Sequence, residues 1–170
     1  MKTIITIIIT VMSIITVIAN ETLPKGCVKF VKSQEGLKLE AYWDVNRWSI
    51  GYGTPSHKGE KITEAEASNR LEKRLLEDQK ALKKFFKDSW TALSDNQKTA
   101  LISLRFNIGT LAGCPKLKKY IIDGDYDSAA KEFLDITVKR SKFKSNSEYL
   151  KVREGLEKRR QRESKLFLKK

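Results

Sequence analysis

The sequence has few of the residues on which disulfide-rich domains and metal sites depend. Its 170 residues include 2 cysteines, 1 histidine and 3 prolines. Two cysteines are too few for a disulfide-dense mini-protein, and with a lone histidine they exclude a four-cysteine zinc site. Scarce proline and 40% hydrophobic residues argue against global disorder. The composition therefore predicts one domain of ordinary size with a short extra segment, and we expect neither a metal nor a cofactor.

Charge is nearly absent from the first twenty residues, of which 13 are apolar and only Lys2 is charged. A positive start, an apolar stretch and the small residue Ala19 match a signal peptide. Hydroxyl residues recur every three or four positions, so an anchor that can release, or a permanent one, is the alternative. We expect residues 1–19 to direct export to the periplasm or the medium, with transient tethering to the inner membrane as the alternative. In that compartment Cys27 and Cys114 either pair or stay isolated thiols.

The other 150 residues are strongly basic, with 33 Lys or Arg against 21 Asp or Glu, a net charge of +12. Residues 151–170 alone hold nine basic and three acidic side chains. Such a helix suits nucleic acid, anionic lipid or an acidic polymer, and export favours an anionic envelope surface over nucleic acid. A solvated helix face without a partner is the alternative. Arg160 and Glu163, three residues apart, are expected to form a structural ion pair.

Apolar periodicity predicts an α+β domain in which helix dominates. A short helix is expected over 23–34, and alternation of apolar and polar residues over 37–54 predicts a β-hairpin. Beyond it the patterns are helical. Capping signals at Thr63, Ser94 and Asp125 predict the starts of three helices, and a last long helix is expected over 148–170.

Two carboxylates are placed where they can border one cleft. Glu35 lies at the junction of the first helix and the hairpin, and Asp44 lies in the hairpin turn. Glycosidic cleavage needs such a pair, because one carboxylic acid protonates the leaving oxygen while a second carboxylate activates water or attacks carbon. Spacing alone is weak support, since any charged protein has such pairs, and on spacing alone two solvated charges are the favoured interpretation.

The residues around these carboxylates form an ordered set of motifs. They are Glu35-Gly36-Leu37, Ala41-Tyr42-Trp43-Asp44, Trp48-Ser49-Ile50-Gly51-Tyr52-Gly53-Thr54, Leu93-Ser94-Asp95-Asn96-Gln97, Phe106-Asn107-Ile108-Gly109, and Gly155-Leu156 with Arg159-Arg160, Glu163 and Leu166-Phe167. Together they resemble the phage-type lysozymes of glycoside hydrolase family 24. The resemblance covers residues 27–168, which leaves 20–26 as a linker.

The resemblance implies a lysozyme-like two-lobed fold, with a small β-hairpin lobe facing a helical lobe. It implies hydrolysis of the β-1,4 bond between N-acetylmuramic acid and N-acetylglucosamine, with inversion. Glu35 is then the general acid, and Asp44 positions or deprotonates the attacking water. Ser49 stands in for the family's Thr, one residue closer to the Asp, and keeps the hydroxyl while losing the methyl. Thr54, where the family often has His, is the second candidate for this role.

Two interpretations fit each of three further residues near the predicted site. Tyr52 and Trp48 either stack on sugar faces or pack in the hairpin, and packing is favoured for Trp48. Asn107 resembles a cleft residue that hydrogen-bonds sugar amides, and the end of a helix is the alternative. His57 is expected to be an exposed loop residue.

The leading hypothesis is a monomeric muramidase acting on bacterial peptidoglycan, either a phage endolysin or a secreted antibacterial lysozyme. A lytic transglycosylase acting on the same bond is one alternative. A non-catalytic cationic protein that binds walls or membranes is another.

Overall fold

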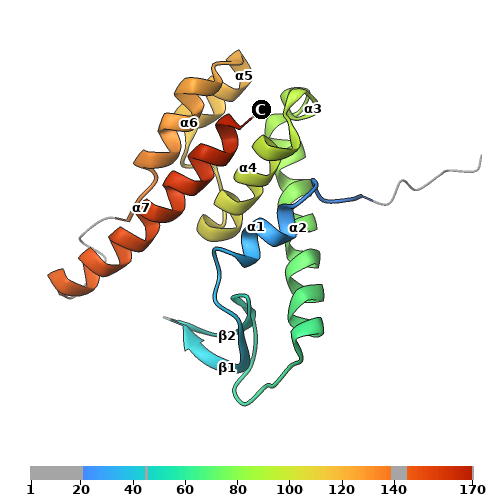
Figure 1. Cartoon of the computed structure of the whole chain (residues 1–170), viewed down its shortest axis with the longest axis vertical. Coiled ribbons are helices and arrows are strands. Elements are labelled where there is room, and N and C mark those ends of the chain that lie inside the picture. Colours follow the sequence, from blue (N-terminus) through green and yellow to red (C-terminus); the bar gives the residue numbers. More distant parts are fainter. Residues whose placement is uncertain (1–20, 45, 139–144, 170) are drawn as a thin grey trace, which may run out of the picture.

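The computed structural model describes residues 21–44, 46–138 and 145–169, and Figure 1 shows their arrangement. The predicted leader over 1–19 lies outside these residues. No helix within the described residues is long and apolar enough to cross a membrane. The fold is mainly helical with one small antiparallel sheet, as predicted, and the sheet lies at one end of the molecule (Figure 1).

The sheet has three strands in the order β1 (Lys38–Asp44), β2 (Arg47–Gly51) and β3 (Thr54–Pro55). The β1–β2 hairpin confirms the prediction from alternation, and the two-residue β3 was not expected. In its register Asp44 lies opposite Arg47, and the pairing is irregular between Lys38 and Tyr42. The hairpin therefore places Asp44 at its tip.

A long helix, α2 (Glu64–Phe86), links the sheet to the other helices. Its start is the predicted capping box, in which Thr63 and Glu66 exchange side-chain and backbone hydrogen bonds. Gly51 of the sheet packs closely here: a Cβ at its position lies 3.0 Å from the Cβ of Ala67. Gly51 also has a φ of +64°, which L side chains rarely adopt, so contact and conformation both require glycine.

The first helix, α1 (Cys27–Lys32), begins later than the predicted residue 23. Pro24 and the left-handed Gly26 (φ +82°) delay it. The preceding segment, predicted as a linker, lies against the helices: Gln79 donates to the Thr22 carbonyl, and Glu21 forms an ion pair with Lys83.

The helical lobe is built around α4 (Asp95–Ile108), which begins with the predicted capping box at Ser94. Short α3 (Ser89–Ala92) precedes it, and α5 (Pro115–Asp123), α6 (Tyr126–Asp135) and α7 (Asn146–Leu168) follow. Helix α7 packs against both α4 and α6 (Figure 1). Helix α4 is buried on nearly all sides, and the core it forms includes Leu101, Leu104, Phe133 and Phe167.

Candidate active site

Glu35 follows α1 and is anchored by its backbone, because its N–H donates to the Val31 carbonyl at 3.2 Å. The side chain is only partly exposed. Its Oε1 accepts a hydrogen bond from Nη1 of Arg159 on α7 at 2.5 Å. A charge-assisted contact of this length fixes the carboxylate against the helical lobe. Arg159 is therefore a candidate site residue, although the motif that contains it was given no role in the site.

Arg159 is held in turn by a buried ionic network. Its Nε donates to Oε1 of Glu163 at 3.0 Å, and its Nη2 donates to the Ser103 carbonyl at 3.2 Å. Glu163 has an exposed fraction of 0% and also pairs with Arg160, which confirms the predicted Arg160–Glu163 ion pair. The guanidinium groups of Arg159 and Arg160 thus share the buried Glu163 carboxylate. The Glu35 carboxylate supplies the second negative charge that balances these two positive charges.

Asp44 and Ser49, the hairpin carboxylate and hydroxyl predicted for the site, are neighbours in the structure. The Ser49 hydroxyl donates to Oδ2 of Asp44 over 3.5 Å, a long contact, and Ser49 has an exposed fraction of 0%. In the hairpin Ser49 lies opposite Tyr42. The shorter turn of this chain therefore still presents a hydroxyl to the Asp44 carboxylate.

Tyr42 lies on β1 opposite Ser49 and is half-buried. Burial raises the pKa of its phenol, and the negative charges of Asp44 and Glu35 raise it further, while the positive charge of Arg47 lowers it.

Thr54 and Tyr52, two further residues considered for the site, are both buried. Tyr52 belongs to the core with 5% exposure, and Lys32 Nζ lies 5.1 Å from its ring centroid. This placement favours packing over sugar stacking. The Thr54 hydroxyl donates to the Ile50 carbonyl at 3.0 Å, which occupies it with the backbone. Trp48 is half-buried and packs edge-to-face on Trp43 with ring centroids 5.7 Å apart.

Asn107 is exposed near the end of α4, and its Oδ1 accepts from Arg160 Nη2 at 2.5 Å. It lines a cavity of about 250 Å³ that has walls from both lobes, including Arg47 of the hairpin and Arg74 of α2. His57 is exposed, as predicted, with Nδ1 3.5 Å from Oε2 of Glu60.

The disulfide alternative for the two cysteines is wrong in this structure, where both are free thiols. Cys27 begins α1 in the core, where burial raises its pKa to about 12. Cys114 is the N-cap residue of α5 and is half-buried. Within the described part of the chain, no three His, Cys, Asp or Glu side chains gather as a metal ion requires.

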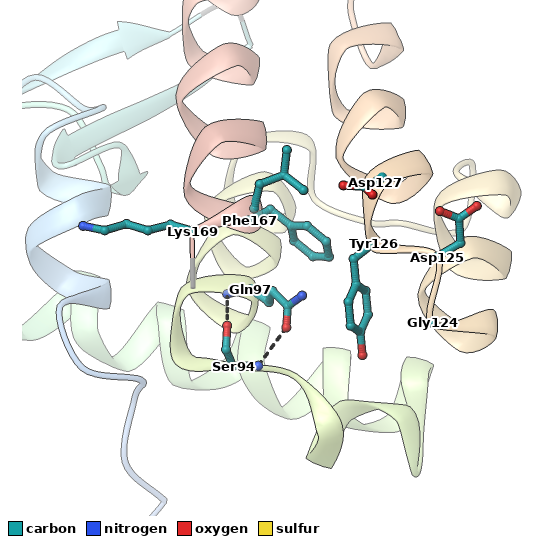
Figure 2. A pocket seen from close by; sticks show the side chains of 9 residues that line it. Ser94, Gln97, Gly124, Asp125, Tyr126, Asp127, Phe167 and Lys169 are labelled. Carbon is teal, nitrogen blue, oxygen red and sulfur yellow. Dashed lines mark hydrogen bonds between the residues drawn. The ribbon is translucent and has the colours of Figure 1, made fainter.

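A second cavity, of about 410 Å³, lies away from the carboxylates. It is formed by the start of α4, the turn between α5 and α6, and the end of α7, and Figure 2 shows Ser94, Gln97, Tyr126 and Phe167 around it. None of the residues predicted for the site lines it. The chemistry is therefore expected at the junction of the lobes.

Comparison with known proteins identifies relatives of the chain. The phage lysozyme family model matches residues 32–163. An endolysin of Bacillus phage B103 is 32% identical over 148 residues, which cover 83% of this chain and 52% of the endolysin, so the chain spans about half the length of that relative.

Solved structures give the same fold. The muramidase domain of SpmX from Asticaccaulis excentricus is 27% identical with a TM-score of 0.74, and the match covers 88% of this chain and 99% of that domain. An endolysin from Escherichia coli O157:H7 phage FAHEc1 is 28% identical with a TM-score of 0.71, covering 88% and 94%. The chain belongs to the phage lysozyme family.

Proposed function

We propose that this protein is a peptidoglycan hydrolase, a muramidase that cleaves the β-1,4 bond between N-acetylmuramic acid and N-acetylglucosamine. The observation that carries the proposal is a pair of carboxylates with polar partners: the Arg159 guanidinium donates to Glu35, and the Ser49 hydroxyl donates to Asp44. The family supports it, since its relatives include an endolysin and a muramidase domain. Residues 27–168 form the catalytic domain, and residues 1–19 direct its export.

In the proposed reaction the protonated Glu35 donates to the leaving glycosidic oxygen as the bond to the muramic acid carbon breaks. Negative charge then develops on the Glu35 carboxylate, where Arg159 is already in hydrogen-bonding position. A donor that is fixed before the reaction stabilises this charge without reorganisation. The buried Glu163 keeps Arg159 in place, so Arg159 and Glu163 are positioning residues.

Asp44 takes the proton of the attacking water, and the Ser49 hydroxyl orients either that water or the Asp44 carboxylate. An acid and a base that work on opposite faces of the sugar give inversion, and such pairs stand about 6.5–9.5 Å apart, against about 5–5.5 Å in retaining enzymes. The partner is bacterial peptidoglycan, and no cofactor takes part.

The positive charge of α7 that would meet the anionic envelope belongs to its exposed side chains. Arg159 and Arg160 of α7 point inward to Glu163, and exposed Arg153 and Lys158 form ion pairs along the helix. The net charge of the helix already counts these glutamates, so the envelope attraction depends on the remaining lysines and arginines of α7.

The test compares Glu35→Gln with Glu40→Gln in a clearing assay on permeabilised bacteria. Glu40 is a matched control, because it is an exposed carboxylate five residues further on, in strand β1, and its one ion pair among the described residues is with Lys61. We expect Glu35→Gln to abolish clearing with an unchanged circular dichroism spectrum, and Glu40→Gln to clear normally. Undiminished clearing by Glu35→Gln would contradict the role of Glu35.

A further inference from the structure

The cavity of about 410 Å³ in the helical lobe is lined by none of the residues assigned to cleavage. It lies between the start of α4, the turn between α5 and α6, and the end of α7 (Figure 2). Phe167 in its lining comes eight residues after Arg159 on α7, which is about 12 Å along the helix from the contact with Glu35. A volume of this size is within the range of small-ligand sites. The cavity is therefore a candidate binding site separate from the proposed catalytic one.

Gln97 brings unused hydrogen-bond donors to this cavity, although its exposed fraction is only 8%. Its Oε1 accepts from the backbone N–H of Ser94 at 2.8 Å, and its own backbone N–H donates to the Ser94 hydroxyl at 3.2 Å. Because this capping box fixes which end of the amide is the oxygen, the Nε2 group points the other way. Figure 2 shows it turned toward Tyr126, and it donates to no other described residue. A ligand that accepts from this buried amide therefore replaces hydrogen bonds that burial has removed.

Aromatic and apolar surface lies beside this amide. Tyr126 is half-buried and packs edge-to-face on the buried Phe167, with ring centroids 6.0 Å apart and ring planes at 73°. Such a contact covers at most one face of the tyrosine ring. Leu168, which is 48% exposed, adds apolar surface to the same cavity. One ligand can therefore contact an aromatic face and the Gln97 donors together.

The charges around the cavity favour a neutral ligand that carries hydroxyl groups. Asp125 and Asp127 line it, and Asp127 has no ion pair within the described part of the chain. The Lys169 side chain extends away from Gln97 and Tyr126 (Figure 2), so it does not offset these carboxylates. Carboxylates accept hydrogen bonds from hydroxyl groups and repel anions. The net charge of +12 over residues 21–170 in turn disfavours a cation.

We propose that this cavity binds an acetamido sugar of the cell-wall glycan, at a site outside the cleft between the lobes. The acetamido carbonyl accepts from Gln97 Nε2, the less polar face of the sugar ring packs on Tyr126, and a ring hydroxyl donates to Asp127. The source of the sugar rests on the proposed muramidase function, since both sugars of that glycan are N-acetylated. The site holds the enzyme on the wall, and cleavage remains with Glu35 and Asp44.

The first experiment follows the Gln97 side-chain amide and the Tyr126 ring by NMR in the ¹³C,¹⁵N-labelled full chain during titration with N-acetylglucosamine. We expect both sets of signals to shift with one dissociation constant on the order of 1 mM, as for a ligand of this size. Glucose and glucosamine lack the acetyl group and should leave both unchanged. No shift with N-acetylglucosamine, or an equal shift with glucose or glucosamine, would overturn the proposal.

A peptide is the other ligand class with an amide carbonyl, and the same titration separates it from a sugar. The probe is N-acetylalanine N-methylamide, which has the amide carbonyl but no sugar ring and no hydroxyl groups. We expect it to shift the Gln97 and Tyr126 signals far less than N-acetylglucosamine at the same concentration. An equal or larger shift would assign the cavity to a peptide and overturn the proposal.

The second experiment uses Gln97→Glu, which removes the amide donors. A glutamate still accepts from the Ser94 N–H, because capping boxes are formed by Glu and Gln alike. Gln161→Glu is the matched control, since it makes the same change at an exposed position of α7. Each is combined with Glu35→Gln and co-sedimented with intact sacculi. We expect Gln97→Glu to lower the ratio of bound to free protein about threefold or more relative to the control, and equal ratios would contradict the proposal.

These experiments separate the cavity from the proposed muramidase function. Failure of the wild type to cleave peptidoglycan contradicts that function and leaves the titration unchanged. A cleaving enzyme whose Gln97 amide does not respond to N-acetylglucosamine contradicts the cavity site alone. Asp127→Ala, at an exposed position, keeps the test open if Gln97→Glu does not fold. It should weaken N-acetylglucosamine binding about threefold or more, and an unchanged dissociation constant would contradict the proposal.

Discussion

Removing the charge of Glu163 is the most informative perturbation of the ionic network behind the site. One oxygen of this fully buried carboxylate accepts from Arg159 at 3.0 Å and from the Ser103 hydroxyl at 2.6 Å, and the other accepts from Arg160. Glu163→Gln keeps the shape of the side chain. The substitution leaves the Arg160 guanidinium without a carboxylate partner. The new amide N–H₂ group is a donor, so it cannot accept a hydrogen bond from the guanidinium that it faces.

The expected loss is large because both arginines are buried. Breaking a buried ion pair by removing one partner costs about 3–5 kcal/mol, since the charge that remains has lost its compensation. For a domain of this size each 1 kcal/mol lowers Tm by about 2–4 °C. We therefore expect Glu163→Gln to lower Tm by about 6–20 °C.

The measurement is thermal and urea unfolding followed by circular dichroism, with Glu154→Gln as the control. Glu154 lies on the same helix and pairs with Lys158, but both side chains are exposed, so its loss should leave stability unchanged within error. A free energy of unfolding for Glu163→Gln within about 1 kcal/mol of wild type would refute the reasoning that the network is a buried, tightly compensated unit.

Three further predictions concern single groups. Hydrogen bonds from Arg70 and Ser56 hold the pKa of Glu60 at about 2, so its stabilising effect is complete above its ordinary value of 4.5 and is lost as pH falls toward 2. The Tm difference between wild type and Glu60→Gln should therefore be present at pH 6 and vanish toward pH 2, and a difference that does not change with pH would contradict it. Burial raises the pKa of Cys27 to about 12, so its thiol should be unreactive at pH 8. A thiol reagent should therefore label only Cys114 before denaturant is added, and labelling of both cysteines at equal rates would contradict this prediction. Ser49→Ala should lower kcat about tenfold while Ser49→Thr stays near wild type, and an Ala variant with normal kcat would remove Ser49 from the mechanism.

Local signals in the sequence predicted much of the fold. The capping boxes at Thr63 and Ser94 are made by residues three positions apart, and the structure forms both. Helix α5 was missed, although Pro115 at its first turn is a start signal. The β-hairpin was predicted from alternation, but β3 has only two residues and gives no period to detect.

The site was predicted less completely, because its decisive contact is not local. Arg159 and Glu35 are 124 residues apart, and no spacing rule connects them. The spacing of Arg160 and Glu163, three residues apart on one helix, did predict their ion pair, which the structure forms. Burial of Tyr52 could not be read from the sequence either, since an aromatic residue after a strand suits both a core and a sugar face.

The products of the reaction decide whether Glu35 and Asp44 hydrolyse a glycosidic bond. Purified peptidoglycan is digested in water enriched in ¹⁸O, and the fragments are analysed by mass spectrometry. We expect fragments ending in reducing muramic acid with one ¹⁸O from the wild type, and no fragments from Glu35→Gln. Anhydromuramic ends, which incorporate no water, or intact glycan with the wild type would exclude hydrolysis by this pair.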